Sequence, residues 1–201
     1  MTVTDSGSFK RKRGRPRQVD RTEEVIRAAA THFGSRGYLA TTLEDIANDL
    51  EMTRPALYNY AKSKKDLLSQ CYEWTSLGFI KRAKDIDTGT GRERLRAFFM
   101  VYAETVCDDE TKCILFDERH HLNEAGLKAS RARRRKINAM VDEILTLGRE
   151  DGTLAAVNSK LAITALFGAF NMLPTLLTHK REDLAQVTSS LLDLLLEGLA
   201  A

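Results

Sequence analysis

Apolar residues recur along most of this chain at intervals of three and four positions, and no stretch alternates strictly between apolar and polar residues. Such spacing places the apolar positions on one face of a helix, so the pattern predicts an all-α fold of about nine helices. The expected helices are one that Thr22 caps and that ends before Gly34 and Gly37, two short ones within 42–61, one from 63 to about 83, one between a linker at 87–91 and an acidic run at 108–110, a short segment at 113–122, one from 124 to about 149, and two at 159–177 and 183–199.

The last expected helix is unusually apolar for a terminal helix. Its apolar positions are Leu184, Val187, Leu191, Leu192, Leu194, Leu195, Leu196 and Leu199. They cover more surface than one packed side of a helix needs, so we expect a partner for this helix.

The residues at 42–61 have the signals of two short helices joined by a tight turn. Thr42 is expected to cap the first helix, with Asp45 completing a capping box, and Thr53 is expected to cap the second. Pro55 fits the first turn of that second helix and Leu57 points inward. The side chains left to face outward are Arg54, Ala56, Tyr58, Asn59 and Tyr60. These groups suit base edges in a major groove, although an ordinary hairpin with a solvated face has a similar pattern.

A basic arm precedes these helices. Six of the eight residues at 10–17 are Lys or Arg, and Gly and Pro interrupt any regular helix there. Arg13, Gly14, Arg15, Pro16 and Arg17 form a stretch that resembles the AT-hook core, which binds a narrow minor groove. A role in localisation or solubility is the alternative.

The charge divides between the two parts of the chain. Residues 1–65 hold 13 Lys and Arg against 8 Asp and Glu, and residues 66–201 hold 18 against 20, so the first part is the basic one. We predict an arm at 1–19, a helix-turn-helix domain at 20–68 and a second domain at 69–201. No signal peptide is recognised, and the apolar stretch at 161–177 is short and interrupted, so we expect a cytoplasmic protein with no membrane contact.

Metal, disulfide and enzyme chemistry find little support in the residues. Cys71, Cys107 and Cys113 are odd in number and have no CxxC spacing, which favours reduced thiols, with a redox pair of Cys107 and Cys113 as the alternative. Glu118 and His121 form a single Glu-x-x-His pair, and a di-iron site needs two such pairs. We therefore predict no metal, no cofactor and no catalytic residue.

Residues 37–47 and 57–68, with the helix before them, resemble the N-terminal domain of TetR-family transcriptional regulators over about residues 20–70. Members of that family usually have glycine where this chain has Glu51, and phenylalanine where it has Ala61. Glu51 is expected to cost about 1 kcal/mol if its φ is positive. Ala61 implies that a neighbouring aromatic side chain such as Tyr60 fills the core, in which case Tyr60 does not read bases.

The resemblance implies a homodimer, paired through its two C-terminal helices, that binds a pseudo-palindromic operator in double-stranded DNA. On the family pattern, Thr42, Thr53, Tyr58 and Lys64 would contact phosphates, whereas Arg54, Ala56 and Asn59 would meet base edges. Repression is the usual outcome in the family. A DNA-binding architectural protein without sequence preference, relying on the basic arm, is the alternative.

The resemblance also implies a small-molecule effector that binds the C-terminal domain and releases the DNA. The candidate pocket lining is Trp74, Phe98, Phe99, Tyr102, Phe116, Met140, Phe167 and Phe170, with His121 and Asn171 as polar groups. These residues favour an apolar effector, and each is also a candidate for ordinary core packing. The C-terminal part is similar to regulators of fatty-acid or sterol catabolism, which respond to acyl-CoA thioesters. The cationic run at 131–136 either holds phosphates of such a ligand or is a solvated helix face.

Overall fold

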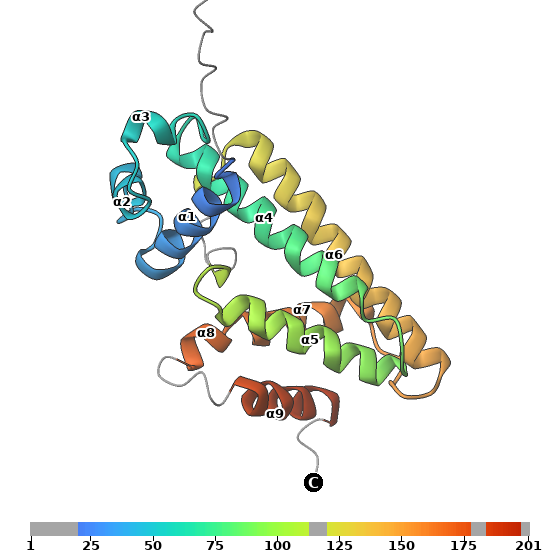
Figure 1. Cartoon of the computed structure of the whole chain (residues 1–201). Helices are drawn as coiled ribbons and strands as arrows, with labels where there is room; N and C mark the ends of the chain where they lie inside the picture. The colour runs from blue at the N-terminus through green and yellow to red at the C-terminus, as the bar shows by residue number, and fades with distance from the viewer. Residues whose placement is uncertain (1–19, 113–119, 178–183, 198–201) are drawn as a thin grey trace, which may run out of the picture.

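The computed structural model describes residues 20–112, 120–177 and 184–197, and these contain helices and turns but no strand. The helices are α1 (Thr22–Arg36), α2 (Leu43–Asp49), α3 (Arg54–Leu57), α4 (Lys64–Lys84), α5 (Gly91–Cys107), α6 (Glu124–Glu150), α7 (Ser159–Asn171), α8 (Leu173–Leu176) and α9 (Leu184–Glu197), as Figure 1 shows. The predicted all-α fold is confirmed. The arm at 1–19 and most of the short segment predicted at 113–122, including Phe116, lie outside the described residues.

Polar caps explain where most helices begin. Thr42 caps α2 and Thr90 caps α5, each within a capping box, and Thr53 and Ser63 cap α3 and α4 through one side-chain hydrogen bond each. The prediction that Thr22 caps α1 is wrong. Thr22 lies inside the helix, and its backbone N–H and hydroxyl both donate to the Asp20 carboxylate.

The predicted helix at 159–177 is divided in two. Helix α7 ends at Asn171 and the single-turn helix α8 begins at Leu173. Pro174 has no N–H to donate and its ring crowds the preceding turn, so a continuous helix through this point is disfavoured.

Two hydrophobic clusters form the core. The first is built from α1 to α4 and includes Leu122, which precedes α6; the second is built from the later part of α4 and from α5 to α9. Helices α4 and α6 lie side by side and run from the first cluster to the second (Figure 1). Two long helices therefore connect the helix-turn-helix end of the molecule to the rest.

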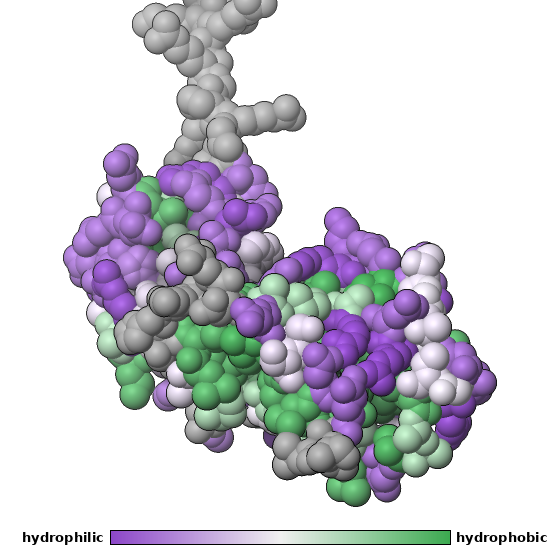
Figure 2. All heavy atoms as spheres, turned by 90° about the horizontal axis from the view of Figure 1, so that it is seen from below, coloured by the Kyte–Doolittle hydropathy of each residue, from purple (hydrophilic) through white to green (hydrophobic). Residues whose placement is uncertain are grey.

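Helix α9 packs one side against α5. Its inward residues Thr188 and Leu192 are buried, and Arg92 of α5 forms an ion pair of 2.5 Å with Glu197. Figure 2 shows the molecule from the α9 side, with apolar residues gathered on this face. The large apolar side chains exposed on α7, α8 and α9 are Leu161, Met172, Leu176 and Leu194, where Met172 is the residue between α7 and α8. Among the described helices, none is both long enough and apolar enough to cross a membrane.

Candidate DNA-reading surface and effector cavity

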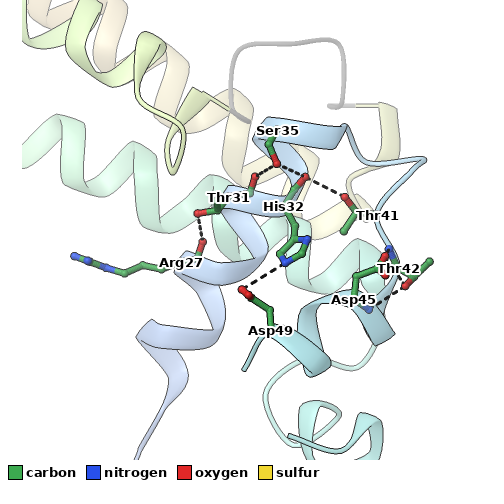
Figure 3. A network of polar contacts seen from close by, with 8 residues as sticks. All are labelled: Arg27, Thr31, His32, Ser35, Thr41, Thr42, Asp45 and Asp49. Carbon is green, nitrogen blue, oxygen red and sulfur yellow. Dashed lines mark hydrogen bonds and ion pairs between the residues drawn. The ribbon is translucent and has the colours of Figure 1, made fainter. Parts of the chain in front are cut away.

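Helix α1 shares the first hydrophobic cluster with both helices of the helix-turn-helix motif, and it also makes polar contacts with α2 and the turn before it (Figure 3). The Thr41 hydroxyl donates to the backbone oxygen of His32 at 3.0 Å and to that of Gly37 at 2.9 Å. The His32 Nε2 atom lies 3.5 Å from the Asp49 carboxylate at the end of α2. These contacts hold both ends of α2 against α1.

The predicted capping box at the start of α2 is confirmed. The Thr42 hydroxyl accepts from the Asp45 backbone N–H at 3.1 Å, and the Asp45 carboxylate accepts from the Thr42 N–H at 2.8 Å. Hydrogen bonds from the Thr42 hydroxyl, and then from its backbone N–H, lower the pKa of Asp45 below its ordinary value. Because both partners are used in this way, the exposed Thr42 is held in one position at the surface.

The turn between α2 and α3 requires a left-handed residue. Glu51 has the positive φ, 50°, that the sequence left open for this position, and the Met52 N–H donates to the Ala47 oxygen at 2.9 Å. Thr53 begins α3 by accepting from the Ala56 N–H at 3.3 Å. This geometry sets the angle at which α3 leaves α2.

The outward side chains of α3 and the turn after it form an exposed polar surface. Arg54, Pro55, Tyr58 and Asn59 are exposed, Ala56 is half-buried, and Leu57 is buried beneath them. The Arg54 Nη2 atom lies 3.4 Å from the Tyr58 hydroxyl, and its guanidinium carbon lies 5.9 Å from the centre of that ring. Arg54 is therefore extended along Tyr58, one turn away on the same side of the segment.

Tyr60 does not belong to this exposed surface. Its side chain is half-buried against the first hydrophobic cluster, next to the buried Ala61, and its backbone oxygen accepts from Gln70 Nε2 at 2.9 Å. The sequence left open whether Tyr60 faces DNA or the core, and this packing favours the core. Ala61 is buried in the same cluster, so both residues pack in the core of the helix-turn-helix domain.

Lys64 begins α4 beside the same domain. Its Nζ atom lies 4.1 Å from the centre of the Tyr38 ring and 3.5 Å from the Leu39 backbone oxygen. The ammonium group is therefore held over an aromatic face, as in a cation–π contact, at the position predicted to contact phosphate.

His121 lies away from the place that the sequence predicted. It stacks on Tyr38, with ring centres 4.4 Å apart and planes at 17°, and so contacts the helix-turn-helix domain. His121 is not among the residues that line the cavity between α4, α5, α6 and α7. No sequence signal pairs two aromatic residues that are so far apart in the chain.

A cavity of about 450 Å³ lies between α4, α5, α6 and α7. Its walls are formed by Tyr72, Ser76 and Phe79 of α4, Tyr102, Thr105 and Val106 of α5, Thr111 after α5, Ser130, Arg133, Arg134, Ile137 and Asn138 of α6, and Ile163, Thr164, Phe167, Gly168 and Asn171 of α7. This volume lies in the usual range for small-molecule sites.

Three of the predicted pocket residues line this cavity. They are Tyr102, Phe167 and Asn171, and the Tyr102 hydroxyl donates to the Asn171 side-chain oxygen at 2.7 Å. The other described candidates pack elsewhere. Phe98, Phe99 and Phe170 are fully buried in the second cluster, Met140 packs against that cluster, and Trp74 faces α1, with the Arg27 guanidinium 5.5 Å from its ring. Apolar periodicity identifies buried faces, but it does not separate a cavity wall from the filled core behind it.

The residues of the cationic run at 131–136 differ in their surroundings. Arg133 and Arg134 line the cavity; Arg133 is half-buried, whereas Arg134 is exposed, as are Arg131, Arg135 and Lys136. The Arg133 Nη1 atom lies 3.4 Å from the Glu73 carboxylate of α4, and its buried Nε atom has no hydrogen-bond partner among the described residues. The cavity therefore combines an aromatic wall with a buried guanidinium group.

The remaining chemistry is limited. Within the described residues, no three His, Cys, Asp or Glu side chains gather as metal ligands would. Burial raises the pKa of the Cys107 thiol to about 11, so this thiol is protonated near neutral pH.

Comparison with known families matches both parts of the chain. Residues 25–71 match the family described as bacterial regulatory proteins, tetR family, and residues 88–199 match the tetracyclin repressor-like C-terminal domain. The HTH-type transcriptional repressor KstR2 of Mycolicibacterium smegmatis is 28% identical over 139 residues, which are 67% of this chain and 68% of that protein.

Two solved structures show the same fold. One is the structure of AibR in complex with isovaleryl coenzyme A and operator DNA, which matches with a TM-score of 0.79 at 21% identity. The match covers 90% of this chain and 100% of the AibR chain. The other is the regulator FadR from Bacillus subtilis in complex with stearoyl-CoA, with a TM-score of 0.75 at 23% identity. This match covers 89% of this chain and 99% of the FadR chain. With a helix-turn-helix domain at one end and a matching C-terminal domain at the other, the chain belongs to the TetR family of bacterial transcriptional regulators and is not an enzyme.

Proposed function

We propose that this regulator is a repressor that binds a pseudo-palindromic operator as a homodimer and leaves it when a small effector binds. The effector has an apolar body, and an acyl-CoA thioester is the first candidate. The observation that carries this proposal is the position of the cavity, because Tyr72 of α4 both lines it and belongs to the first hydrophobic cluster. A ligand in the cavity would therefore touch the helix that supports the DNA-reading motif. A protein with this role works beside the chromosome, in the cytoplasm.

The proposed DNA contacts are made by Thr42 at the start of α2, by the exposed surface of α3 and the turn after it, and by Lys64 at the start of α4. Arg54 and Asn59 have the donors and acceptors to read base edges, while Thr42, Thr53, Tyr58 and Lys64 are suited to phosphate contacts. The basic residues at 10–17 would add phosphate and minor-groove contacts. In this proposal, the helix-turn-helix domain at 20–68 binds the DNA and the domain at 69–201 binds the effector.

The proposed dimer interface is the apolar side of α7, α8 and α9. Leu161, Leu176 and Leu194 are exposed there, and apolar surface gathered on one face favours association with a second copy. A two-fold axis through this face would place two DNA-reading motifs on one side of the duplex. The half-sites should then be about 34–36 Å apart or a multiple of that distance.

The composition of the cavity wall supports the proposed class of effector. Phe79, Tyr102 and Phe167 provide aromatic surface, and Arg133 and Arg134 provide positive charge. Such a wall suits a molecule with an apolar chain and an anionic group, and an acyl-CoA thioester has both. The complexes of AibR and FadR with CoA thioesters are further support for this class.

Thermal unfolding with a panel of acyl-CoA thioesters tests the effector. A thioester at 100 times its dissociation constant should add about 2.7 kcal/mol to the free energy of unfolding, and free coenzyme A should add less because it lacks the acyl chain. Absence of a shift with every thioester would exclude this ligand class.

Two glycine variants test whether the ligand occupies the cavity. Gly168 lines the cavity and Gly78 lies on the exposed side of α4, and a Cβ atom at either position would meet nothing within 4 Å. Gly168→Leu should reduce the thioester shift by occupying the cavity wall, and Gly78→Leu should leave it unchanged. Equal shifts in the two variants would place the ligand elsewhere.

Selection of bound sequences from a random duplex library tests the operator. A regulator should prefer the selected sequence by about 10³-fold or more over random DNA. Equal affinity for the selected sequence and for random A·T-rich DNA would support the architectural alternative instead.

A further inference from the structure

Arg133 is incompletely satisfied in its present position. Its side chain is 12% exposed, and its acidic partner among the described residues, Glu73, places Oε1 3.4 Å from Nη1. The Nε atom is buried and has no hydrogen-bond partner among the described residues. A buried guanidinium group with unused donors gains free energy from a closer anion, because it has already given up much of its hydration.

Glu73 can leave this contact at low cost. Its side chain is 58% exposed, so its carboxylate can return to water without being buried elsewhere. Glu73 lies on α4, directly after Tyr72, which packs in the first hydrophobic cluster with the helix-turn-helix residues. The ion pair therefore joins α6, which forms part of the cavity wall, to α4, which packs against α1 of the helix-turn-helix domain.

We propose that an effector with an anionic group takes Arg133 from Glu73 and thereby breaks this contact between α4 and α6. The inference rests on the proposed function, in which the cavity holds the effector. It specifies the ligand as an apolar chain that bears an anion, and it makes the Arg133–Glu73 pair the contact that distinguishes the free state from the bound state. The anion is either the carboxylate of a free acid or a phosphate of a thioester.

This competition predicts that removing the Glu73 charge favours the ligand. Glu73→Gln destabilises the free arrangement, in which the pair is formed, and leaves the guanidinium available to the ligand. For a partly exposed ion pair, affinity for an anionic ligand should rise about two- to fivefold. A residue that merely supported the fold would lower ligand affinity or leave it unchanged.

Glu104→Gln is the matched control. Glu104 of α5 forms an ion pair with Arg82 of α4, so this variant removes the same charge from another contact of α4, outside the cavity wall. Arg133→Met is the complementary variant, since it keeps an unbranched side chain without the guanidinium group.

Isothermal titration of the full-length protein with decanoyl-CoA, decanoate and 1-decanol provides the test. Glu73→Gln should bind decanoyl-CoA or decanoate about two- to fivefold tighter than the wild type, with affinity for 1-decanol and every affinity of Glu104→Gln unchanged. Arg133→Met should lose the preference for the anionic probe over 1-decanol. A gain for decanoate identifies the carboxylate, and a gain for decanoyl-CoA alone identifies the phosphates.

The outcomes separate the two proposals. If the wild type binds an anionic probe but Glu73→Gln behaves as Glu104→Gln does, or gains equally for 1-decanol, the inference is overturned and the cavity site stands. If the wild type binds none of the probes, the proposed effector class fails and the inference fails with it.

Release from the selected operator tests the link to DNA. Binding free energies are coupled reciprocally, so Glu73→Gln should need about two- to fivefold less of the bound probe for half-release. An unchanged half-release concentration, despite tighter binding of the probe, would show that the pair is not coupled to the DNA-reading motif.

Discussion

His121 stacks on Tyr38, with ring centres 4.4 Å apart and planes at 17°. His121 precedes α6, a helix that lines the cavity, whereas Tyr38 precedes α2 of the helix-turn-helix motif. The Nζ atom of Lys64 lies 4.1 Å from the centre of the same Tyr38 ring. The segment before α6 therefore contacts Tyr38, the residue that holds Lys64, a candidate for binding DNA phosphate.

Loss of this stacking should destabilise the protein. His121→Ala should lower the free energy of unfolding by about 1 kcal/mol, the usual value of an aromatic pair beyond its burial. His121→Phe, which keeps a flat ring, should retain most of it. Urea unfolding measures both values, and equal stability of the wild type and His121→Ala would show that the stack contributes nothing.

Asn59 should contribute to sequence recognition. Asn59→Ala should weaken binding to the selected operator by about 1–3 kcal/mol, the range for a bidentate base contact, and leave affinity for random DNA unchanged. Fluorescence anisotropy with both duplexes measures the difference. Asn48→Ala, on the exposed side of α2, is the matched control and should bind both as the wild type does. An equal loss of affinity for the two duplexes would indicate that Asn59 contacts the DNA backbone and not a base edge.

Deletion of residues 10–17 should weaken binding to DNA without regard to its sequence. Affinity should fall for the operator and for random DNA alike, because binding to phosphates does not depend on sequence. The slope of log affinity against log salt should become shallower by about 0.9 for each phosphate that the arm neutralises in the full-length protein. An unchanged slope would indicate that the arm does not touch the DNA backbone.

Glu51→Gly should stabilise the helix-turn-helix domain. Glu51 has φ of 50°, where an L-residue with a Cβ atom is strained, and glycine removes about 1 kcal/mol of that strain. Glu51→Ala, which removes the carboxylate but keeps Cβ, should give no such gain. Thermal and urea unfolding of the two variants separate backbone strain from charge.

The capping box at Asp45 should make stability depend on pH at the acidic end. Hydrogen bonds from Thr42 lower the pKa of Asp45 in the folded protein, so its contribution is present above the ordinary carboxylate pKa and is lost as the pH falls through the lowered value. Urea unfolding from about pH 6 to about pH 3 should show a smaller acid loss in Asp45→Asn than in the wild type. Identical slopes would contradict this.

Local chemistry explains which parts of the fold could be predicted. The capping box of Thr42 and Asp45 and the left-handed Glu51 depend on neighbours within a few residues, so their geometry follows from the sequence. The break at Pro174 and the start of α1 beside Asp20 are also local, but competing signals at Thr22 and in the apolar stretch obscured them.

The cavity could be predicted only in part. Tyr102, Phe167 and Asn171 line it, yet Phe98, Phe99 and Phe170 have the same periodicity and lie in the filled core. Periodicity reports which face of a helix is buried, and whether the space beyond that face is filled depends on side chains from three other helices.

The sequence by itself determined the helices, the helix-turn-helix motif and the membership of the family, because caps, turns and apolar spacing act over a few residues. Only the tertiary structure decided that Tyr60 turns to the core, that His121 contacts Tyr38, and that Arg133 of the cationic run lies at the cavity beside Glu73. These contacts join residues that are far apart in the chain or depend on such contacts, and apolar spacing within one helix does not report them.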